Sequence, residues 1–234
     1  MHVRYRQISR RTLLKWLAMS AAASSLPSLT GCTSSDAPDA PILPTVIPRS
    51  DWKAVAPDLN APGEHGLYDP KTNPEGWLVY DTPLPDVLNT VVIHHSALPL
   101  SDGPHQIQYK HMHDKGFADI GYHFVIDDSG QIYAGRSLTV RGAHTGGHNT
   151  GTIGVVLMGN FEEAEPTPLQ LTNVKTLIRY LTSQYTLTHL AGHRDFQPDE
   201  TVCPGKHLEP RLPDLAAELG LKFGTDGYTG PQTP

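Results

Sequence analysis

The chain has 234 residues, of which 38% are hydrophobic and 18% charged, and its formal net charge at pH 7 is −6. This length suits one domain with a full core and short tails. The first 31 residues carry five basic and no acidic side chains, so the remainder is more acidic still. An acidic surface argues against nucleic-acid binding, and we expect no nucleic acid among the partners.

The first 31 residues have the pattern of a removable export signal. Ser9–Lys15 resembles a twin-arginine signal, with Leu13 where Phe is commoner. The uncharged stretch Trp16–Leu26 follows, and Leu29–Cys32 then resembles a lipoprotein signal-peptidase site. The apolar run is shorter than the roughly 20 residues that a bilayer span needs. We therefore favour a signal peptide over 1–31, rather than a buried N-terminal helix.

The resemblance to lipoprotein signals implies that Cys32 is lipidated and begins the exported protein. The acyl chains, not a spanning helix, would then attach it to the membrane. Thr33 replaces the Asp that usually retains lipoproteins at the inner membrane, which indicates the periplasmic side of an outer membrane if the cell has one. Residues 32–45 form a predicted flexible linker. A domain over 46–222 and a disordered tail over 223–234 follow.

Strand and helix signals alternate along the predicted domain. In chain order they are a buried strand over Thr90–Ile93 that ends at His94, a helix over Ser101–Lys115, a hairpin of Tyr122–Ile126 and Gln131–Ala134, a strand over Ile153–Met158, a helix from the capping box Thr167–Gln170, a strand over Leu187–Ala191 and a helix near Asp214–Leu221. This alternation predicts an α/β fold, a single domain with a central mixed β-sheet flanked by helices. Functional residues are then expected at strand ends and loops.

Two adjacent histidines, His94 and His95, follow the first predicted strand. Neighbouring strand residues point to opposite faces, so only one of them can join a given site, and the spacing does not choose between them. His111 and His113 lie two residues apart on a predicted helix and also diverge. We expect these two to be partly exposed side chains rather than a metal-binding pair.

A second candidate segment runs from His193 to Cys203. If Cys32 is lipidated, Cys203 is the remaining thiol of an exported protein and needs an explanation. A buried, inert Cys is one interpretation. Its place in a turn marked by Pro204 and Gly205, ten residues after His193, favours metal ligation instead. Two imidazoles and one thiolate would leave the fourth position of a zinc ion open, as in catalytic sites. A thiol used in this way leaves none for a disulfide between chains, and we expect a monomer.

Five blocks of sequence together resemble the zinc amidases of the N-acetylmuramoyl-L-alanine amidase type 2 family, which includes the peptidoglycan recognition proteins. The blocks are Val91–Ala97, Asp119–Ile126, Gly142–Thr145, Asn149–Val155, and Gly192–Asp195 continued by Cys203–Gly205, and Arg49–Trp52 looks like the start of the domain. The resemblance covers residues 46–220. It implies a zinc amidase domain with zinc held in a surface groove.

By matching positions, the resemblance implies a zinc-ligand set of His94, His193 and Cys203. The activity it implies is hydrolysis of the amide bond between N-acetylmuramic acid and L-alanine, in peptidoglycan or in muropeptide fragments. Two other functions stay open: a module that binds peptidoglycan without cleaving it, and a zinc endopeptidase that cuts within the stem peptide. The presence of the Cys ligand favours an enzyme.

The same matching assigns four further positions. Tyr122 and Thr201 become candidate catalytic residues that position water or donate hydrogen bonds to the developing oxyanion. His144 and Asn149 become candidate substrate-binding residues. Neither hydroxyl is a good base at its ordinary pKa, and no Glu stands at the tyrosine position, so the proton acceptor stays open.

Structural explanations compete with some of these assignments. Tyr122 can be a core aromatic residue of a strand, Thr201 a turn hydroxyl that bonds its own backbone, and His144 a residue that orders its loop. Arg194 and Asp195 can form a local ion pair that holds the segment after His193.

Overall fold

The computed structural model describes residues 42–61, 64, 79–80 and 82–228. The predicted signal over 1–31, Cys32 and most of the predicted linker lie outside these residues. Among the helices that are described, none combines the length and the apolar composition needed to cross a bilayer.

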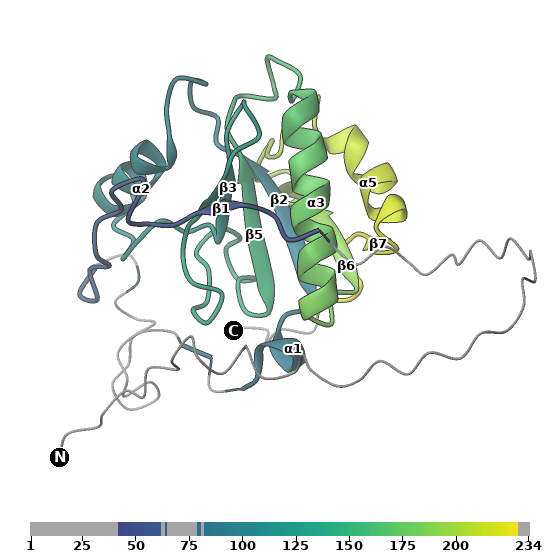
Figure 1. The fold of residues 1–234 in the computed structure, drawn as a ribbon, viewed down its shortest axis with the longest axis horizontal. Helices are drawn as coiled ribbons and strands as arrows, with labels where there is room; N and C mark the ends of the chain where they lie inside the picture. Colours follow the sequence, from purple (N-terminus) through teal and green to yellow (C-terminus); the bar gives the residue numbers. More distant parts are fainter. Residues whose placement is uncertain (1–41, 62–63, 65–78, 81, 229–234) are drawn as a thin grey trace, which may run out of the picture. The chain divides into compact units, whose positions relative to one another are not determined.

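The described residues contain one seven-stranded sheet with the order β1-β4-β3-β5-β2-β6-β7 (Figure 1). The strands are β1 (Val46–Ile47), β2 (Thr90–His95), β3 (Phe124–Ile126), β4 (Ile132–Ala134), β5 (Thr152–Leu157), β6 (His189–Gly192) and β7 (Lys222–Phe223). The helices are α1 (Leu84–Val87), α2 (Pro104–His113), α3 (Pro168–Gln184), α4 (His193–Phe196) and α5 (Leu212–Glu218), with a 3-10 turn over Glu209–Arg211. The β3–β4 pair is antiparallel and the other neighbours are parallel. The predicted α/β domain with a mixed sheet is confirmed.

Local sequence signals explain the hairpin and the long helix. Asp127 accepts a hydrogen bond from the backbone N–H of Gln131 (2.8 Å), which closes the turn between β3 and β4. Thr167 accepts from the backbone N–H of Gln170 (3.1 Å), while the Gln170 side chain accepts from the N–H of Thr167 (3.0 Å). This reciprocal capping box fixes the start of α3 as predicted.

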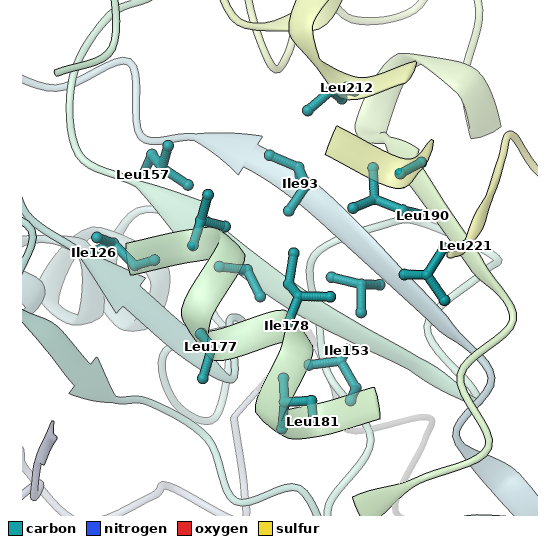
Figure 2. Packing of buried hydrophobic residues seen from close by; sticks show 14 of the residues in the cluster. Ile93, Ile126, Ile153, Leu157, Leu177, Ile178, Leu181, Leu190, Leu212 and Leu221 are labelled. Atoms are coloured by element: carbon teal, nitrogen blue, oxygen red, sulfur yellow. The ribbon is translucent and has the colours of Figure 1, made fainter. Parts of the chain in front are cut away.

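One face of the sheet packs against α3 and α5 and forms the main core (Figure 2). Val91 and Ile93 of β2 lie in this core, next to Leu177, Ile178 and Leu181 of α3. Because side chains alternate along a strand, the residues between them project to the other face.

The other face packs against α2, which lies across the sheet from α3 (Figure 1). Its smaller cluster contains Ile107 of α2 together with Val125, Val156 and Met158. His94 alternates with Ile93 and therefore belongs to this face, whereas His95 belongs to the α3 face. Ile93 of β2 pairs with Gly192 of β6, so His94 near the end of β2 and His193 directly after β6 lie at the same edge of the sheet.

The ordered chain continues past the predicted end of the domain at residue 222. Phe223 belongs to β7, and Gly224 donates a backbone hydrogen bond to Leu190 (2.9 Å). The ring of Tyr228 contacts the rings of His148 and Phe196, with centroids 5.3 and 5.4 Å away. The predicted tail over 223–234 therefore begins too early, because these contacts hold the chain through Tyr228. Residues 229–234 lie outside the described part.

Candidate metal centre and its groove

The structure brings His94, His193 and Cys203 together at the carboxyl edge of β2 and β6. One potential ligand atom from each lies within 4.8 Å of the other two. The Nδ1 atom of His94 is 3.6 Å from the Sγ atom of Cys203, and the His94 and His193 ring centroids are 4.6 Å apart. His95 is excluded from the group, because its Nδ1 accepts from the N–H of Phe161 (3.2 Å) on the opposite face. The expectation that only one of the paired histidines reaches the site is confirmed.

The donor set and its spacing fit a zinc ion. Zinc bonds of about 2.0–2.1 Å to nitrogen and 2.3 Å to sulfur, set at a tetrahedral angle, place the two ligand atoms about 3.5 Å apart. The His94 Nδ1 to Cys203 Sγ distance of 3.6 Å agrees with this spacing. Two imidazoles and one thiol also leave the open fourth position that distinguishes catalytic from structural zinc sites.

The electrostatics of the two histidines also favour metal binding, whereas those of the free thiol oppose it. Burial, followed by the neighbouring histidines, lowers the pKa of His94 well below its usual range, and burial also lowers the pKa of His193. Both rings are therefore neutral, as ligation requires. Burial raises the pKa of the Cys203 thiol to about 12, while the backbone N–H of His95 donates to Sγ (3.4 Å) and opposes the increase. A bound cation would stabilise the thiolate, since a coordinating thiol is deprotonated.

Each histidine of the triplet also has a hydrogen-bonding partner on its other ring nitrogen. The Nε2 atom of His193 lies 2.6 Å from the Oε1 atom of Gln197, and the Nε2 atom of His94 lies 3.1 Å from the Nδ1 atom of His144. Metal-binding histidines commonly use the second nitrogen in this way, which fixes the orientation of the ring.

The segment from His193 to Cys203 is fastened at both ends. Asp195 accepts from the N–H of Gly192 (2.7 Å) at the start of α4. The N–H of Arg194 donates to the carbonyl of Cys203 (2.9 Å), and its guanidinium forms an ion pair with Glu209. The alternative of an ion pair between Arg194 and Asp195 does not apply, because Arg194 pairs with Glu209 and Asp195 bonds the backbone of Gly192.

A groove of about 440 Å³ opens beside the triplet. Its lining includes four predicted site residues, Tyr122, His144, Asn149 and His193. His94 and Cys203 are more deeply buried, with 0% and 6% of their surfaces exposed. His193 is therefore the member of the triplet that faces the solvent-filled groove, whereas His94 and Cys203 are shielded from solvent.

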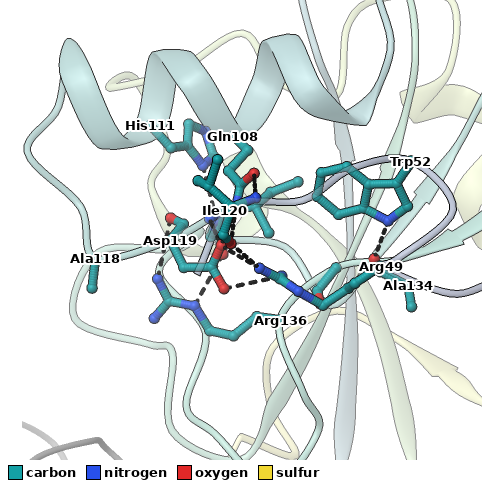
Figure 3. A network of polar contacts seen from close by, with 12 residues as sticks. Arg49, Trp52, Gln108, His111, Ala118, Asp119, Ile120, Ala134 and Arg136 are labelled. Carbon is teal, nitrogen blue, oxygen red and sulfur yellow. Dashed lines mark hydrogen bonds and ion pairs between the residues drawn. The ribbon is translucent and has the colours of Figure 1, made fainter. Parts of the chain in front are cut away.

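A buried polar network holds the segment that leads into Tyr122 (Figure 3). Asp119 forms an ion pair with Arg49 (3.0 Å) and accepts hydrogen bonds from Gln108 (2.6 Å) and from the N–H of Ile120 (2.7 Å). Arg136 donates to the carbonyl of Ile120 (3.0 Å). These contacts fix the backbone just before Tyr122.

Arg136 also connects this network to the wall of the groove. Its guanidinium forms a buried ion pair with Glu64 (2.9 Å), which lines the groove. Both groups are almost wholly removed from water, so removing either partner would leave an unpaired buried charge. Glu64 is thereby engaged as a structural anion at the groove wall.

Tyr122 lies against the triplet. Its ring centroid is 5.0 Å from that of His94 and 5.2 Å from that of His111. Burial, followed by the nearby Cys203, raises the pKa of Tyr122 above its ordinary value of 10. The phenol therefore keeps its proton at neutral pH, which suits a hydrogen-bond donor and disfavours a general base.

The structure places the other predicted residues differently. Thr201 accepts from the N–H of Cys203 (3.1 Å) and lines a separate hollow with Arg194 and Glu200, outside the groove. Asn149 accepts from the N–H groups of His144 and Thr145 (2.8 Å each), which orders their loop. The catalytic role of Thr201 and the substrate contact of Asn149 stay predictions.

Several groove residues were not singled out from the sequence. Lys115, Phe117, Arg141 and Gln197 all line it. Gln197 had a usable signal, because it lies four residues after His193, the spacing of neighbours on one helical face. The positions of the other three depend on how the loops fold over the sheet.

His111 was predicted to be partly exposed, and this was wrong. Only 6% of it is exposed, and its Nδ1 atom accepts from the N–H of Gly121 (2.8 Å). Its place beside Tyr122 is created by the folding of Gly121 onto α2, a contact that helix periodicity does not report.

Comparisons with known proteins show the family of the chain. The sequence profile of the N-acetylmuramoyl-L-alanine amidase family matches residues 84–206. The chain belongs to the N-acetylmuramoyl-L-alanine amidase family. It is 32% identical to peptidoglycan-recognition protein SD of Drosophila melanogaster over 173 residues, which are 70% of this chain and 81% of the relative. It is 28% identical to peptidoglycan recognition protein 1 of Mus musculus over 177 residues, 70% of this chain and 83% of the relative.

Solved structures of this family share the fold. The N-acetylmuramoyl-L-alanine amidase LysC from Clostridium intestinale aligns with a TM-score of 0.53 and 34% identity, covering 62% of this chain and 93% of LysC. Drosophila peptidoglycan recognition protein SD aligns with a TM-score of 0.59 and 30% identity, over 73% and 94% of the two chains. Peptidoglycan recognition protein LE, solved with tracheal cytotoxin, a monomeric peptidoglycan, aligns with a TM-score of 0.58 and 26% identity, over 72% and 92%. The family includes both catalytic and non-catalytic members.

Proposed function

We propose that this protein is a zinc-dependent N-acetylmuramoyl-L-alanine amidase that acts on peptidoglycan or muropeptide fragments. The observation that carries the proposal is the intact triplet of His94, His193 and Cys203 beside a groove. Three protein ligands with an open position are typical of hydrolytic zinc. The resemblance to relatives named for peptidoglycan recognition supports the substrate class.

The groove residues support a hydrolytic reaction at the triplet. When bound, zinc lowers the pKa of a water molecule to about 7 and polarises a carbonyl group. In the proposed reaction water adds across the amide: the C–N bond breaks, the lactyl carbonyl becomes a carboxylate, and the alanine nitrogen leaves as an amine. The neutral phenol of Tyr122 donates a hydrogen bond to the oxygen on which negative charge develops. Gln197 contacts the Nε2 atom of His193 (2.6 Å), and His144 contacts the Nε2 atom of His94 (3.1 Å).

We also propose that the protein is exported and anchored to the cell envelope by lipid on Cys32. The basic segment with twin arginines, the short apolar run and the Leu29–Cys32 motif support this proposal. Cys32→Ser is expected to abolish lipid incorporation and to move the protein out of the membrane fraction. Equal amounts of wild type and variant in that fraction would contradict it.

The amidase proposal is tested by incubating the purified, zinc-loaded protein with peptidoglycan and identifying the products by mass spectrometry. We expect free stem peptides that begin with L-alanine and glycan chains that retain unsubstituted muramic acid. Peptide fragments together with a stump still attached to muramic acid would indicate a zinc endopeptidase. Binding without any product, in protein shown to contain zinc, would indicate a recognition module.

A further inference from the structure

The family resemblance predicts that His144 binds the substrate. In the structure, a ring nitrogen of His144 instead faces His94, a candidate metal ligand. The Nδ1 atom of His144 lies 3.1 Å from the Nε2 atom of His94 and 2.9 Å from the hydroxyl of Thr145. The two imidazole rings meet edge to face, with centroids 5.0 Å apart. Only 8% of His144 is exposed. We propose that His144 is a positioning residue that holds His94 in the orientation and tautomer needed to bind zinc.

The arrangement of protons follows from which nitrogen of His94 faces the metal site. Its Nδ1 atom lies 3.6 Å from the Cys203 sulfur, so this nitrogen presents its lone pair to the site. A neutral imidazole then carries its proton on Nε2, and this N–H donates to Nδ1 of His144. The hydroxyl of Thr145 lies 2.9 Å from the same Nδ1 atom, whose single lone pair takes the His94 N–H. His144 is thereby an acceptor at Nδ1 and carries its own proton on Nε2.

Two glycines hold the His144 ring in a slot. A Cβ atom at Gly154 of β5 would lie 2.5 Å from the Cδ2 atom of His144, and one at Gly142 would lie 2.4 Å from it. The ring therefore occupies the space that ordinary side chains would take at both positions. Asn149 fixes the backbone beneath it by accepting from the N–H groups of His144 and Thr145. A ring confined in this way presents its Nδ1 atom to His94 at a fixed place.

The same slot limits what else His144 does. Its Nε2 atom is buried and forms no close hydrogen bond with the described residues, and the backbone of Thr152 lies within reach of the ring. The ring edge that has partners is the one turned toward His94 and Thr145. Metal-binding histidines usually donate to a carboxylate, a carbonyl or water, and here a neutral imidazole takes that place. We therefore assign His144 a role at the metal centre in addition to its place in the lining of the groove.

This inference rests on the proposed zinc function, and a nearly isosteric pair of variants tests it. His144→Asn retains an acceptor close to the position of Nδ1, whereas His144→Leu has almost the same shape and no acceptor. Zinc affinity, measured by competition with a chromophoric chelator, is expected to fall about 10–100-fold in His144→Leu. In His144→Asn it is expected to stay within about threefold of wild type, because the acceptor for His94 is retained. His189→Leu removes a buried histidine elsewhere on the sheet and is expected to leave zinc affinity unchanged.

The outcomes separate the two proposals. Failure of the wild type to bind zinc would overturn the proposed function. Zinc binding by wild type with equal affinity in His144→Leu, or equally weak binding in His144→Asn and His144→Leu, would overturn the positioning role. Imidazole nitrogen NMR of the zinc-loaded wild type needs no variant: we expect the proton of His144 on Nε2, and a protonated Nδ1 atom would overturn the inference even if the variants fail to fold.

Discussion

The two faces of the sheet are built from alternate residues of the same strands, yet one buries mainly apolar side chains and the other buries several histidines. The α3 face packs Val91 and Ile93 of β2 into a core made mostly of aliphatic side chains, with Phe161 among them. The α2 face receives His94 from the same strand and surrounds it with further buried histidines, among them His111, His123 and His144. The period of two residues thus separates the main hydrophobic core from the face that holds the candidate metal centre.

This division predicts opposite responses on the two faces. Substitutions on the α2 face should change metal binding and catalysis with a limited loss of stability. Substitutions on the α3 face should do the reverse. Four changes, ordered by the size of the expected effect, break or sharpen this division.

The largest effect is expected for Cys203→Ser. A hydroxyl is a far weaker zinc ligand than a thiolate, so we expect zinc affinity to fall at least about 100-fold and hydrolysis to be lost. The zinc-free variant should unfold at nearly the same urea concentration as zinc-free wild type. Unchanged metal content, measured by atomic emission after dialysis, would remove Cys203 from the ligand set.

Tyr122→Phe is expected to reduce kcat by about 10²–10³, the loss typical of removing one oxyanion donor. Zinc affinity should not change, because the hydroxyl is not a ligand. Tyr133→Phe is the matched control, since that hydroxyl donates to Asp127 in the hairpin (2.8 Å). Steady-state kinetics on a muropeptide compare the two. An unchanged kcat in Tyr122→Phe would reduce this residue to a packing role.

On the α3 face, Leu177→Ala should lower the free energy of unfolding by about 2–5 kcal/mol, because it leaves a cavity in the main core. Zinc affinity of the folded variant should match wild type. Leu169→Ala, on the exposed side of the same helix, should cost less than about 0.5 kcal/mol. Urea denaturation of wild type, Leu177→Ala and Leu169→Ala measures these differences in the free energy of unfolding. A large change in zinc affinity in Leu177→Ala would show that the faces are coupled.

The smallest effect per residue is expected for the acid stability of the zinc-free protein. Burial lowers the pKa of His123 to about 4 and that of His111 to about 3, from an ordinary 6.5. The unfolded chain therefore takes up protons below pH 6.5 that the folded chain refuses, and stability falls as the pH decreases toward those folded pKa values. Between pH 7 and pH 5 each of the two should cost roughly 2 kcal/mol.

Urea denaturation at intervals across this pH range measures the loss. His123→Gln removes one of the two titrating groups and should make the dependence shallower. If the free energy of unfolding changes with pH equally in wild type and His123→Gln, protonation of His123 does not contribute to the loss of stability.

Much of this architecture could be predicted from the sequence because its signals are local. The capping box at Thr167 and the turn at Asp127 each rest on contacts within a few residues. The apolar run of β2 likewise predicts a buried strand, and the alternation of its side chains limits the site to one of its two histidines. The family resemblance then chose His94 from this pair as the expected ligand.

The parts that were missed depend on contacts between distant segments. His111 is buried because Gly121 folds onto α2, and Gln108 is enclosed because Asp119 and Arg49 meet there. The short strands β1 and β7 have two residues each and carry no period of their own. The orientation of the His144 ring likewise follows from a slot made by two glycines on different segments. No pattern in the sequence reports such a fit.

The ring cluster of His148, Phe196 and Tyr228 has a practical consequence for work on this protein. His148 belongs to the loop whose neighbouring residues line the groove, and Phe196 ends the short helix that begins with His193. Aromatic pairs of this kind contribute about 0.5–1.5 kcal/mol each beyond their burial. A protein that ends at residue 222, the domain end predicted from the sequence, would lack Tyr228. Both His148 and Phe196 would then lose their ring contact with it. Expression boundaries and affinity tags therefore belong beyond Tyr228. Measurements on a shorter protein would describe a groove whose neighbouring loop and helix lack these ring contacts.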